Sequence, residues 1–549
     1  MLKNRKTSHA VSIQMSGVMQ KRFFPLLLSV MLLLSGATDT VAEHAISFET
    51  TKTLLSRHPK NSLVYLESEA ISPDTAHIAF VAKSDMGMFV VRDGKSGKIY
   101  DHVAKGYPIF SPRGNRLGYI ADRAGKVFVV VDDQEYPGFD GASDLSFSPD
   151  GTRFSYIAQK GKKQVVVLDG KVKNSFDFVD RVIGVIFSPD SRHTAYSGLI
   201  NNKETLFVDG KPQPFLFDTI EEFMFSPDSK QFAFTGNRDK KYYVIQNSNS
   251  FGPFEKAGGL VWSPDSKQLV LVAIKLGKWI TVKNGAEIPS GRYYVKTVFN
   301  PVKKQYEYLV PEMTMPVFSP DSSRLAFTMA HGSRYRICVD GEMGPLFDSV
   351  STPFFSPDSK HLAYIGVVSQ KQTNNKVLIL DGKQVGNRYK HIEPPLVFSP
   401  DSSKIAYRAK DKDNKWLVVV NGKEYPQQWD AVDLPVFSPD SRHIAYRAQK
   451  NGLYTIVKDG IFSRPFLEAT TPVFSPNGDY LAYLGKTEEV KSHLFVNNIR
   501  VADFTIFLTE SQKKYRPVIF DSPGHLHFIS FQLIKNRFSV YKTDVYIKH

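Results

Sequence analysis

Few residues of this chain have the types and spacing that catalysis or the binding of a cofactor requires. Neither Gly-x-Ser-x-Gly nor His-Glu-x-x-His, which are typical of hydrolase nucleophiles and zinc peptidases, occurs in it. Gly94-Lys95-Ser96 ends like a phosphate-binding loop, but such a loop needs a glycine five positions before Gly94, where Phe89 stands. We therefore predict a hairpin turn at Gly94, no catalytic residues and no cofactor in a chain that is not an enzyme.

Metal-binding patterns are equally incomplete. Asp411-Lys412-Asp413-Asn414 begins like a calcium loop, but Lys415 and Trp416 stand where a ligand and the glycine belong, so we predict a polar loop. His525 and His527 lie on one face of an expected strand and could bind a metal only if a third ligand approached. We predict no metal site.

One phrase, an aromatic or apolar residue followed by Ser-Pro-Asp or a close variant, recurs along the whole chain. It is centred on twelve prolines: Pro73, Pro112, Pro149, Pro189, Pro227, Pro264, Pro320, Pro357, Pro400, Pro439, Pro476 and Pro523. Successive copies lie 37 to 43 residues apart, except for 56 residues after Pro264 and 47 before Pro523. A period near 40 residues made of strands is the length of a propeller blade. Any site in this chain must therefore be positioned by repeated blades.

Within one period the pattern predicts two hairpins. In residues 353–386 a short strand leads into Ser356-Pro357-Asp358-Ser359, a turn in which proline supplies the required φ. Residues 361–364 alternate as the returning strand, and a polar loop leads to a third strand at 376–380. Asp381-Gly382 then forms a two-residue turn into the fourth strand.

Three polar positions repeat from blade to blade. Asp-Gly or a near equivalent recurs at residues 93, 132, 169, 209, 284, 340, 421, 459 and 497. Histidine recurs at the start of the second strand, where we expect surface turn residues, at His77, His193, His361 and His443. An aromatic residue and an acid precede several phrases, at Phe139-Asp140, Phe217-Asp218, Phe254-Glu255, Phe347-Asp348 and Trp429-Asp430. Such repetition predicts that the acid accepts backbone N–H groups at a turn between blades, with a cation-binding ring of acids as the alternative.

We expect an all-β fold of tandem β-propellers with about twelve blades of four antiparallel strands. The 56-residue step holds a degenerate half-unit at 298–310, with six phrases before it and six after. Because common propellers have four to eight blades, two six-bladed rings are expected, one at 43–310 and one at 311–549. Residues 46–67 or 296–310 would close the first ring. A seven-bladed first ring that uses both segments is the alternative.

The N-terminus predicts export. Lys21-Arg22 precede an apolar run at residues 23–34, and small residues follow it, which is the pattern of a secretory signal in residues 1–42 with cleavage near Ala42. The run is too short for a comfortable transmembrane span, and no later stretch is apolar enough to cross a membrane. We therefore expect a periplasmic or secreted protein without a transmembrane segment in its mature chain.

Composition places the chain among globular proteins, with 42% hydrophobic and 23% charged residues. The net charge is +15, of which residues 1–42 contribute +4, and it favours an anionic partner such as an acidic glycan or lipopolysaccharide. A protein partner is equally expected, and a nucleic acid is not. Cys338 is the only cysteine and is expected to be a buried, inert thiol. Translation begins at Met1 or Met19.

The phrase Phe-Ser-Pro-Asp-[Ser/Gly]-x-x-[Leu/Ile]-Ala-[Tyr/Phe], at forty-residue spacing behind an export signal, resembles the WD-like propeller repeats of TolB. TolB is the periplasmic component of the Tol-Pal envelope system, and the same repeats occur in propeller domains of dipeptidyl and prolyl peptidase relatives. The resemblance covers nearly all of residues 71–549 and implies a propeller fold. TolB carries an α/β domain before its propeller and the peptidases a hydrolase domain after theirs. Neither domain is expected here, so the resemblance implies no activity.

A specific site is expected where the blades disagree, because positions identical from blade to blade build the scaffold. The blades differ most in the loops between second and third strands and in the connections between blades, both expected on the face opposite the Ser-Pro-Asp and Asp-Gly turns. These segments are 199–204, 369–376, 387–395, 409–415 and 486–492. The candidate partner-binding residues in and beside them are Asn201, Lys203, Lys371, Asn374, Lys376, Arg388, Lys390, Lys410, Lys412 and Lys415.

The resulting hypothesis is an exported, non-enzymatic scaffold that binds a protein or an envelope polymer through this variable face. One alternative is a lyase or hydrolase that acts on an acidic polysaccharide in a central channel, which a convergent cluster of His, Tyr, Arg and Asp would favour. Another is an accessory propeller subunit of a separately encoded peptidase.

Overall fold

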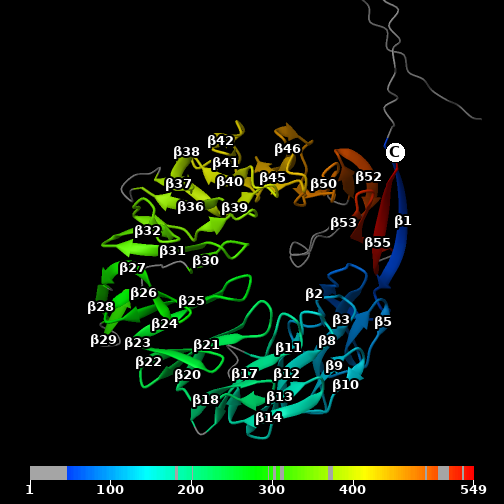
Figure 1. Cartoon of the computed structure of the whole chain (residues 1–549). Coiled ribbons are helices and arrows are strands. Elements are labelled where there is room, and N and C mark those ends of the chain that lie inside the picture. The colour runs from blue at the N-terminus through cyan, green and yellow to red at the C-terminus, as the bar shows by residue number, and fades with distance from the viewer. Residues whose placement is uncertain are drawn as a thin grey trace, which may run out of the picture. The chain divides into compact units, whose positions relative to one another are not determined.

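The described part of the chain is built of strands. The computed structural model describes residues 46–179, 184–200, 202–294, 296–300, 305–309, 315–368, 375–488, 491–504, 518–534 and 537–548. The segment from Ile46 to Lys548 forms one compact unit, and its described residues contain 55 strands (Figure 1). Among the described residues there is no helix long and apolar enough to cross a membrane. The predicted signal at residues 1–42 lies outside these ranges.

Twelve sheets in these ranges share one construction, and we number them as blades 1 to 12 in chain order. Blades 1 to 4 consist of β2 (Leu63–Ile71), β3 (Ile78–Ser84), β4 (Gly87–Arg92) and β5 (Lys95–Ser96); β6 (His102–Val103), β7 (Ile109–Phe110), β8 (Leu117–Arg123), β9 (Lys126–Val131) and β10 (Gln134–Glu135); β11 (Gly141–Phe147), β12 (Phe154–Lys160), β13 (Lys163–Leu168) and β14 (Lys171–Phe176); and β15 (Phe178–Val179), β16 (Ile186–Phe187), β17 (Thr194–Ile200), β18 (Lys203–Val208) and β19 (Lys211–Pro212).

Blades 5 to 8 consist of β20 (Thr219–Phe225), β21 (Phe232–Arg238), β22 (Lys241–Gln246) and β23 (Asn249–Phe254); β24 (Lys256–Trp262), β25 (Leu269–Lys275), β26 (Lys278–Lys283) and β27 (Ala286–Tyr294); β30 (Val317–Phe318), β31 (Leu325–His331), β32 (Arg334–Val339) and β33 (Glu342–Met343); and β34 (Ser349–Val350), β35 (Phe354–Phe355), β36 (Leu362–Val367), β37 (Lys376–Leu380) and β38 (Lys383–Tyr389). The two strands β28 (Lys296–Asn300) and β29 (Gln305–Leu309) form a separate hairpin between blades 6 and 7.

Blades 9 to 12 consist of β39 (His391–Phe398), β40 (Ile405–Lys410), β41 (Trp416–Val420) and β42 (Lys423–Glu424); β43 (Ala431–Val432), β44 (Val436–Phe437), β45 (Ile444–Lys450), β46 (Leu453–Lys458) and β47 (Ile461–Phe462); β48 (Glu468–Ala469), β49 (Val473–Phe474), β50 (Leu481–Glu488), β51 (Lys491–Val496) and β52 (Ile499–Phe504); and β53 (Val518–Ser522), β54 (His525–Ile534), β55 (Arg537–Lys548) and β1 (Ser47–Arg57). In five blades the first strand is divided into two segments.

Blade 8 shows why the repeat folds as predicted. The Ser359 N–H donates to the Ser356 carbonyl at 2.9 Å and closes the Ser-Pro-Asp turn between β35 and β36. Asp381 and Gly382 both have positive φ, 49° and 76°, as a two-residue hairpin turn with right-handed twist requires. All strand pairs in the blade are antiparallel. The prediction of two hairpins per blade is confirmed, as are the all-β class and the count of about twelve blades.

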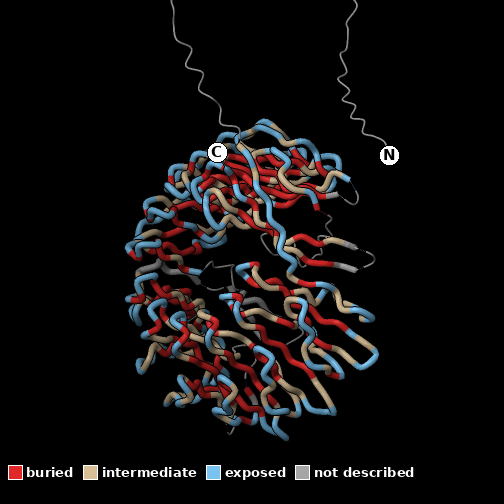
Figure 2. Tube along the Cα trace, turned by 90° about the vertical axis from the view of Figure 1, so that its right-hand side faces the viewer, coloured by how far each residue is buried: buried red, intermediate tan, exposed pale blue. Residues whose placement is uncertain are grey.

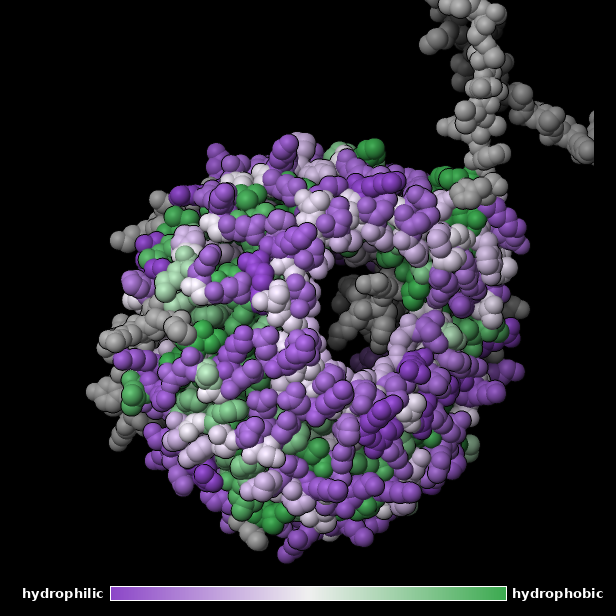
Figure 3. All heavy atoms as spheres, viewed as in Figure 1, coloured by the Kyte–Doolittle hydropathy of each residue, from purple (hydrophilic) through white to green (hydrophobic). Residues whose placement is uncertain are grey.

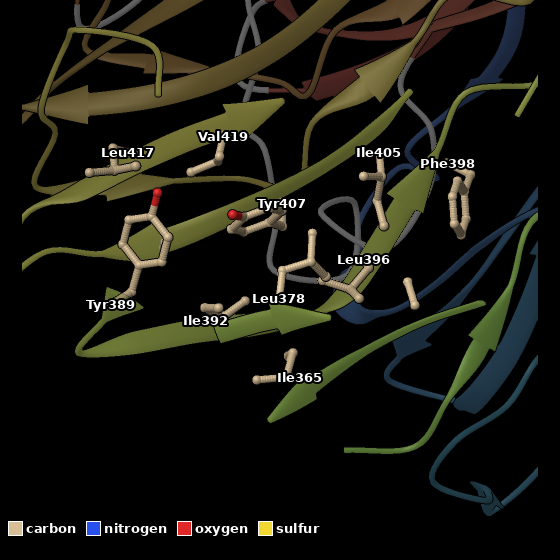
Figure 4. Close-up of a cluster of buried hydrophobic side chains, with 12 residues drawn as sticks. Ile365, Leu378, Tyr389, Ile392, Leu396, Phe398, Ile405, Tyr407, Leu417 and Val419 are labelled. Carbon is tan, nitrogen blue, oxygen red and sulfur yellow. The ribbon is translucent and has the colours of Figure 1, made fainter. Parts of the chain in front are cut away.

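Neighbouring blades pack face to face through shared apolar clusters. Between blades 8 and 9, Leu378 and Ile365 meet Ile405 and the rings of Tyr389 and Tyr407 (Figure 4). Burying a large side chain of this kind stabilises the fold by about 1.5–3 kcal/mol. Figure 2 shows the buried residues concentrated along the middles of the blades and the exposed ones at the turns. The aromatic-rich composition therefore reflects one large ring per repeated core position.

The Ser-Pro-Asp turns add a second link between blades. The Asp358 N–H of blade 8 donates to Ser402 Oγ of blade 9 at 3.0 Å. The same bond, at 2.9–3.0 Å, joins Asp150 to Ser191, Asp190 to Ser229, Asp228 to Ser266, Asp265 to Ser322, Asp321 to Ser359 and Asp401 to Ser441. Gly478 replaces the serine in blade 11, and a Cβ there would lie only 2.8 Å from the Asp440 carboxylate. The phrase is thus a connector between blades as well as a turn.

The expected division into two six-bladed rings, at residue 310, is wrong. The bond from Asp265 to Ser322 joins blade 6 to blade 7 across the 56-residue step, at the same 2.9 Å as elsewhere in the ring. Val270 of blade 6 packs with Leu325 of blade 7. The extra residues of the step form the β28–β29 hairpin, which adds length without interrupting the series of blades. The boundary was misplaced because the size of the ring was inferred from common propellers, which have four to eight blades.

The ring closes between blade 12 and blade 1. Strand β1 pairs antiparallel with β55 and becomes the outermost strand of blade 12, so both ends of the described chain build the same sheet. Phe531 and Val540 of blade 12 share an apolar cluster with Ile71 of blade 1. Residues 46–57 therefore do close a ring, as the sequence suggested, but with the last blade. One ring of twelve blades results (Figure 1).

We predict that Ser322→Ala lowers the free energy of unfolding by about 1–2 kcal/mol, because the Asp265 N–H loses its acceptor in a partly buried position. The midpoint of urea unfolding measures this change. Ser323→Ala is the matched control, since the Ser323 hydroxyl bonds only to Asp321 of its own turn. Equal shifts for the two variants would contradict the link between blades 6 and 7.

Candidate functional site

The ring has two faces with different chemistry. We call the face that carries the Ser-Pro-Asp and Asp-Gly turns the turn face. We call the opposite face, which carries the connections between second and third strands and between successive blades, the loop face. In Figure 1 the first strands β2, β30, β39 and β53 lie beside the central opening, and Figure 3 shows that opening bordered largely by hydrophilic residues.

On the turn face the repeated polar side chains are used by the fold. Ser356 Oγ donates to Asp358 Oδ1 at 2.6 Å, and the same carboxylate accepts the Lys360 N–H at 3.1 Å. His361 Nδ1 lies 2.7 Å from Asp381 Oδ2, while Asp381 Oδ1 accepts the Leu362 N–H. His77, His193 and His443 make the same contact with the aspartate of their own Asp-Gly turns. These histidines are turn residues, as predicted.

Hydrogen bonds hold the carboxylates of this face in their charged form. The Ser319 hydroxyl and the Ser323 N–H lower the pKa of Asp321 to about 2. The serine of the same phrase likewise lowers the pKa of Asp150, Asp190, Asp228, Asp265, Asp358, Asp401 and Asp440. The turn face is therefore a ring of carboxylates, each hydrogen-bonded within its own turn.

We predict that acid destabilises the ring steeply. Because these carboxylates have a lower pKa in the folded than in the unfolded chain, the stability that they contribute is complete above about pH 4. It is lost as the pH falls toward about 2, the pKa of Asp321. Thermal unfolding at pH 7, 4, 3 and 2 measures the loss.

Asp321→Asn is the matched variant for this test, because blade 11 naturally carries Asn477 at the equivalent position, where it accepts the Ser475 hydroxyl. It should make the acid-induced loss shallower. An unfolding temperature that stays constant from pH 4 to pH 2 would contradict the assignment.

On the loop face the recurring acid has the predicted structural role. Asp430 Oδ2 accepts the Asn451 N–H at 2.7 Å and so fixes the turn between β45 and β46. Its other oxygen lies 2.6 Å from Lys415 Nζ of blade 9, so the acid also joins two blades. Lys415 and the Asn451 N–H lower the pKa of Asp430. Asp140 makes the same contacts, accepting the Gly161 N–H at 2.8 Å and Lys126 Nζ at 2.7 Å.

This network occupies several of the residues predicted to bind a partner. Lys203 pairs with Asp218, and Lys415 with Asp430. Lys410 Nζ lies 4.7 Å from the centre of the Trp416 ring. These three lysines therefore stabilise the blades.

The other predicted binding residues are placed differently. Lys376 Nζ lies 2.8 Å from His391 Nδ1, and burial lowers the pKa of Lys376. The side chains of Arg388, Lys390 and Lys412 are exposed on the loop face. Asn201, Lys371 and Asn374 lie outside the described residues.

The other motifs from the sequence have structural roles. Asp411 Oδ1 accepts the N–H groups of Asp413 and Lys415, both at 2.9 Å, so this segment is the expected polar loop. Cys338 is 1% exposed, and burial raises the pKa of its thiol. A buried thiol of raised pKa reacts slowly, in agreement with the prediction of an inert cysteine.

A cavity of about 390 Å³ between blades 1 and 2 was not predicted. Tyr65, Glu67, Ser68, Met88, Lys105 and Tyr107 contribute to its lining. It forms where the first strands are irregular, because the register of β2 shifts between Tyr65 and Ala70 and the first strand of blade 2 is divided. The sequence carries one signal of this cavity, namely polar residues in the middle of a segment expected to form a first strand.

Glu69 lies in the same irregular stretch of β2. Burial raises the pKa of its carboxyl to about 8, and Oε2 is buried without a hydrogen-bond partner. A carboxyl in this environment is protonated at neutral pH and can donate a hydrogen bond.

A second group of chemically capable side chains lies in blade 12. His527 Nδ1 is 2.6 Å from Asp521 Oδ2, and His525 Nε2 is 3.1 Å from Asp544 Oδ1. Asp521, His527 and Asp544 place one potential ligand atom each within 4.8 Å of one another. The structure therefore places two carboxylates, Asp521 and Asp544, beside the histidines. They are the further potential ligands that the sequence analysis required but did not identify. Asp544 could not be identified in advance, because only the register of β54 and β55 sets it opposite His527.

No protein-family model and no curated protein matches this chain. Among solved structures, a eukaryotic initiation factor is similar at 14% identity and a TM-score of 0.33, over 64% of this chain and 96% of that one. TolB from Acinetobacter baumannii is similar at 14% identity and a TM-score of 0.21, over 49% and 75%. A dipeptidyl aminopeptidase IV from Bacteroides ovatus is similar at 11% identity and a TM-score of 0.27, over 65% of each chain. These structures include both kinds of propeller that the repeats resemble.

Proposed function

We propose that this chain is an exported, non-enzymatic scaffold that binds a protein or an anionic envelope component through its loop face. The observation that carries the proposal is the contrast between the faces. On the turn face one hydrogen-bonded motif is repeated around the ring, whereas on the loop face the connections differ from blade to blade. Variation on a rigid framework is where specific contacts arise.

The exposed side chains of the loop face suit such partners. Lys390 and Lys412 are exposed there and carry positive charge. Met86 and Leu276, at turns between second and third strands, are 76% and 81% exposed. A surface that presents both ammonium and apolar groups can contact an acidic protein or an amphiphilic anion such as lipopolysaccharide. Export is supported by the basic and apolar pattern of residues 21–34.

Charge reversal on each face tests this proposal. Lys390→Glu with Lys412→Glu should weaken binding to lipopolysaccharide vesicles, or to an envelope protein retained at high salt, by about tenfold, because charge attraction becomes repulsion. Lys383→Glu with Lys423→Glu is the matched control, since both lysines are exposed directly after the Asp-Gly turns of the same two blades. Surface-immobilised protein, titrated with each probe at low and high salt, provides the measurement.

Equal weakening by both pairs would mean that net charge alone attracts the probe, and it would contradict a loop-face site. Retention of a separately encoded hydrolase would instead support the role of an accessory peptidase subunit.

The cavity between blades 1 and 2 favours a second candidate, turnover of an acidic polysaccharide at the central opening. Lys105 would neutralise a uronate, and Tyr65 and Tyr107 offer hydroxyl groups for proton transfer. Glu67 is the one carboxylate among the lining residues, so a lyase fits better than a hydrolase that uses two carboxylates. Absorbance of the unsaturated product should appear with wild type and fall at least tenfold in Tyr107→Phe. No product from any acidic polysaccharide would exclude this candidate.

A further inference from the structure

Four side chains meet where the ring closes, and we call them the seam cluster: Asp521, His525, His527 and Asp544. Asp521 is the next-to-last residue of β53, His525 and His527 are the first and third residues of β54, and Asp544 lies on β55 opposite His527. The strand β55 also pairs with β1, where Thr51 is the partner of Asp544. The cluster therefore lies in the one blade that is assembled from both ends of the described chain.

The two imidazoles are surrounded by oxygen atoms. His525 Nδ1 is 3.1 Å from Asp521 Oδ2, and its Nε2 is 3.1 Å from Asp544 Oδ1. His527 Nδ1 is 2.6 Å from the same Asp521 oxygen. A neutral imidazole donates one hydrogen bond, so His525 cannot satisfy both carboxylates at once without an added positive charge. Lys542 Nζ, 3.6 Å from Asp544 Oδ1, faces one side of the cluster only.

The cluster exceeds what the repeat requires. In blades 1, 4, 8 and 10 the histidine four residues after the phrase proline faces one aspartate, as in His361 and Asp381, and His527 stands at the same distance from Pro523. Among the described residues, blade 12 adds a second histidine and a second carboxylate. His527 is only 2% exposed, whereas the side chains of His193 and His361 are 43% exposed. Burying an imidazole costs free energy unless its nitrogens are hydrogen-bonded or bound to a metal.

Neighbouring side chains hold His527 in the orientation that is typical of a metal-binding histidine. Its Nε2 contacts Thr75 Oγ1, on the first turn of blade 1, which leaves Nδ1 directed at Asp521 and Asp544. A hydrogen bond from the far ring nitrogen to a fixed oxygen is the usual second contact of a metal-binding histidine. The His525 ring is likewise held, stacked on Tyr546 with centroids 4.5 Å apart.

We propose that the seam cluster binds one divalent transition-metal ion, of which zinc fits best, and that the ion fastens blade 12 to blade 1. Two imidazoles and two carboxylates form a four-ligand set typical of zinc, whereas calcium and magnesium prefer oxygen ligands alone. Three of the ligand atoms already lie within 4.8 Å of one another, so small movements bring them to bonding distance. Because His527 also contacts Thr75, ion binding stabilises ring closure.

Calorimetric titration of the chelator-treated full chain with Zn²⁺ tests the proposal, together with thermal unfolding in the presence and absence of Zn²⁺. One ion should bind per chain and raise the unfolding temperature, because a ligand that binds only the folded state stabilises it. Ca²⁺ and Mg²⁺ at equal concentration should give no comparable shift. His525→Gln, at a partly buried position, and Asp521→Asn, at an exposed one, should each weaken Zn²⁺ binding at least about tenfold.

The matched control is His361→Gln, which removes the equivalent histidine in blade 8 and should leave Zn²⁺ binding within about twofold. If chelation itself unfolds the ring, the zinc content of the purified protein replaces the titration, and His525→Gln should lower it while His361→Gln should not. The absence of stoichiometric zinc in both measurements, or binding that is unchanged in His525→Gln and Asp521→Asn, would overturn the proposal. The cluster would then be a hydrogen-bonded closure only.

Discussion

The contact on which the ring depends is the hydrogen bond from the aspartate N–H of one Ser-Pro-Asp turn to the serine hydroxyl of the next. It repeats at nearly constant length, and each copy holds two successive blades together at the same edge. The shared apolar clusters hold the same blades together through their middles. The turn hydrogen bond and the apolar cluster join the same two blades at different places, one at the edge and one in the middle. Together they fix the angle between the blades, so the same small rotation is repeated until the last blade meets the first. A full turn divided among twelve blades is about 30° for each.

Charged side chains also form contacts between neighbouring blades. A chain with a net charge of +15 suggests a surface free to bind anions, yet many of its lysines and arginines lie beside acids of neighbouring blades. Lys126, Lys203 and Lys415 each pair with the acid that begins the next blade. Each exposed pair contributes little by itself, but the geometry recurs around the ring and orders the turns of the loop face. An anionic partner of the kind proposed would therefore contact cations outside this pattern, such as Lys390 and Lys412.

Local features of the fold could be predicted from the sequence, and contacts between distant residues could not. Ser356-Pro357 and Asp381-Gly382 specify turns through their own backbone preferences, so the hairpins were evident. Ring size depends on whether β55 meets β1, which are almost the whole chain apart, and no local pattern reports that contact. Lys415 was interpreted as a binding residue because its partner Asp430 belongs to the next blade. Asp544 was missed for the same reason, since strand register alone places it beside His527.

Repetition within one chain separates structural from functional chemistry in this protein. A side chain that recurs at equivalent positions performs the same task in every blade, and the contacts of Asp358, Asp381 and Asp430 agree with that reasoning. A polar side chain found in one blade alone has no such explanation. His525 is of this kind, because the blades whose histidine lies four residues after the proline, as His527 does, carry threonine or serine two residues earlier, at Thr75, Ser191, Ser359 and Ser441. It stands where the ring must be closed by contacts between the two ends of the chain, the place at which one added ligand can change the stability of the whole ring.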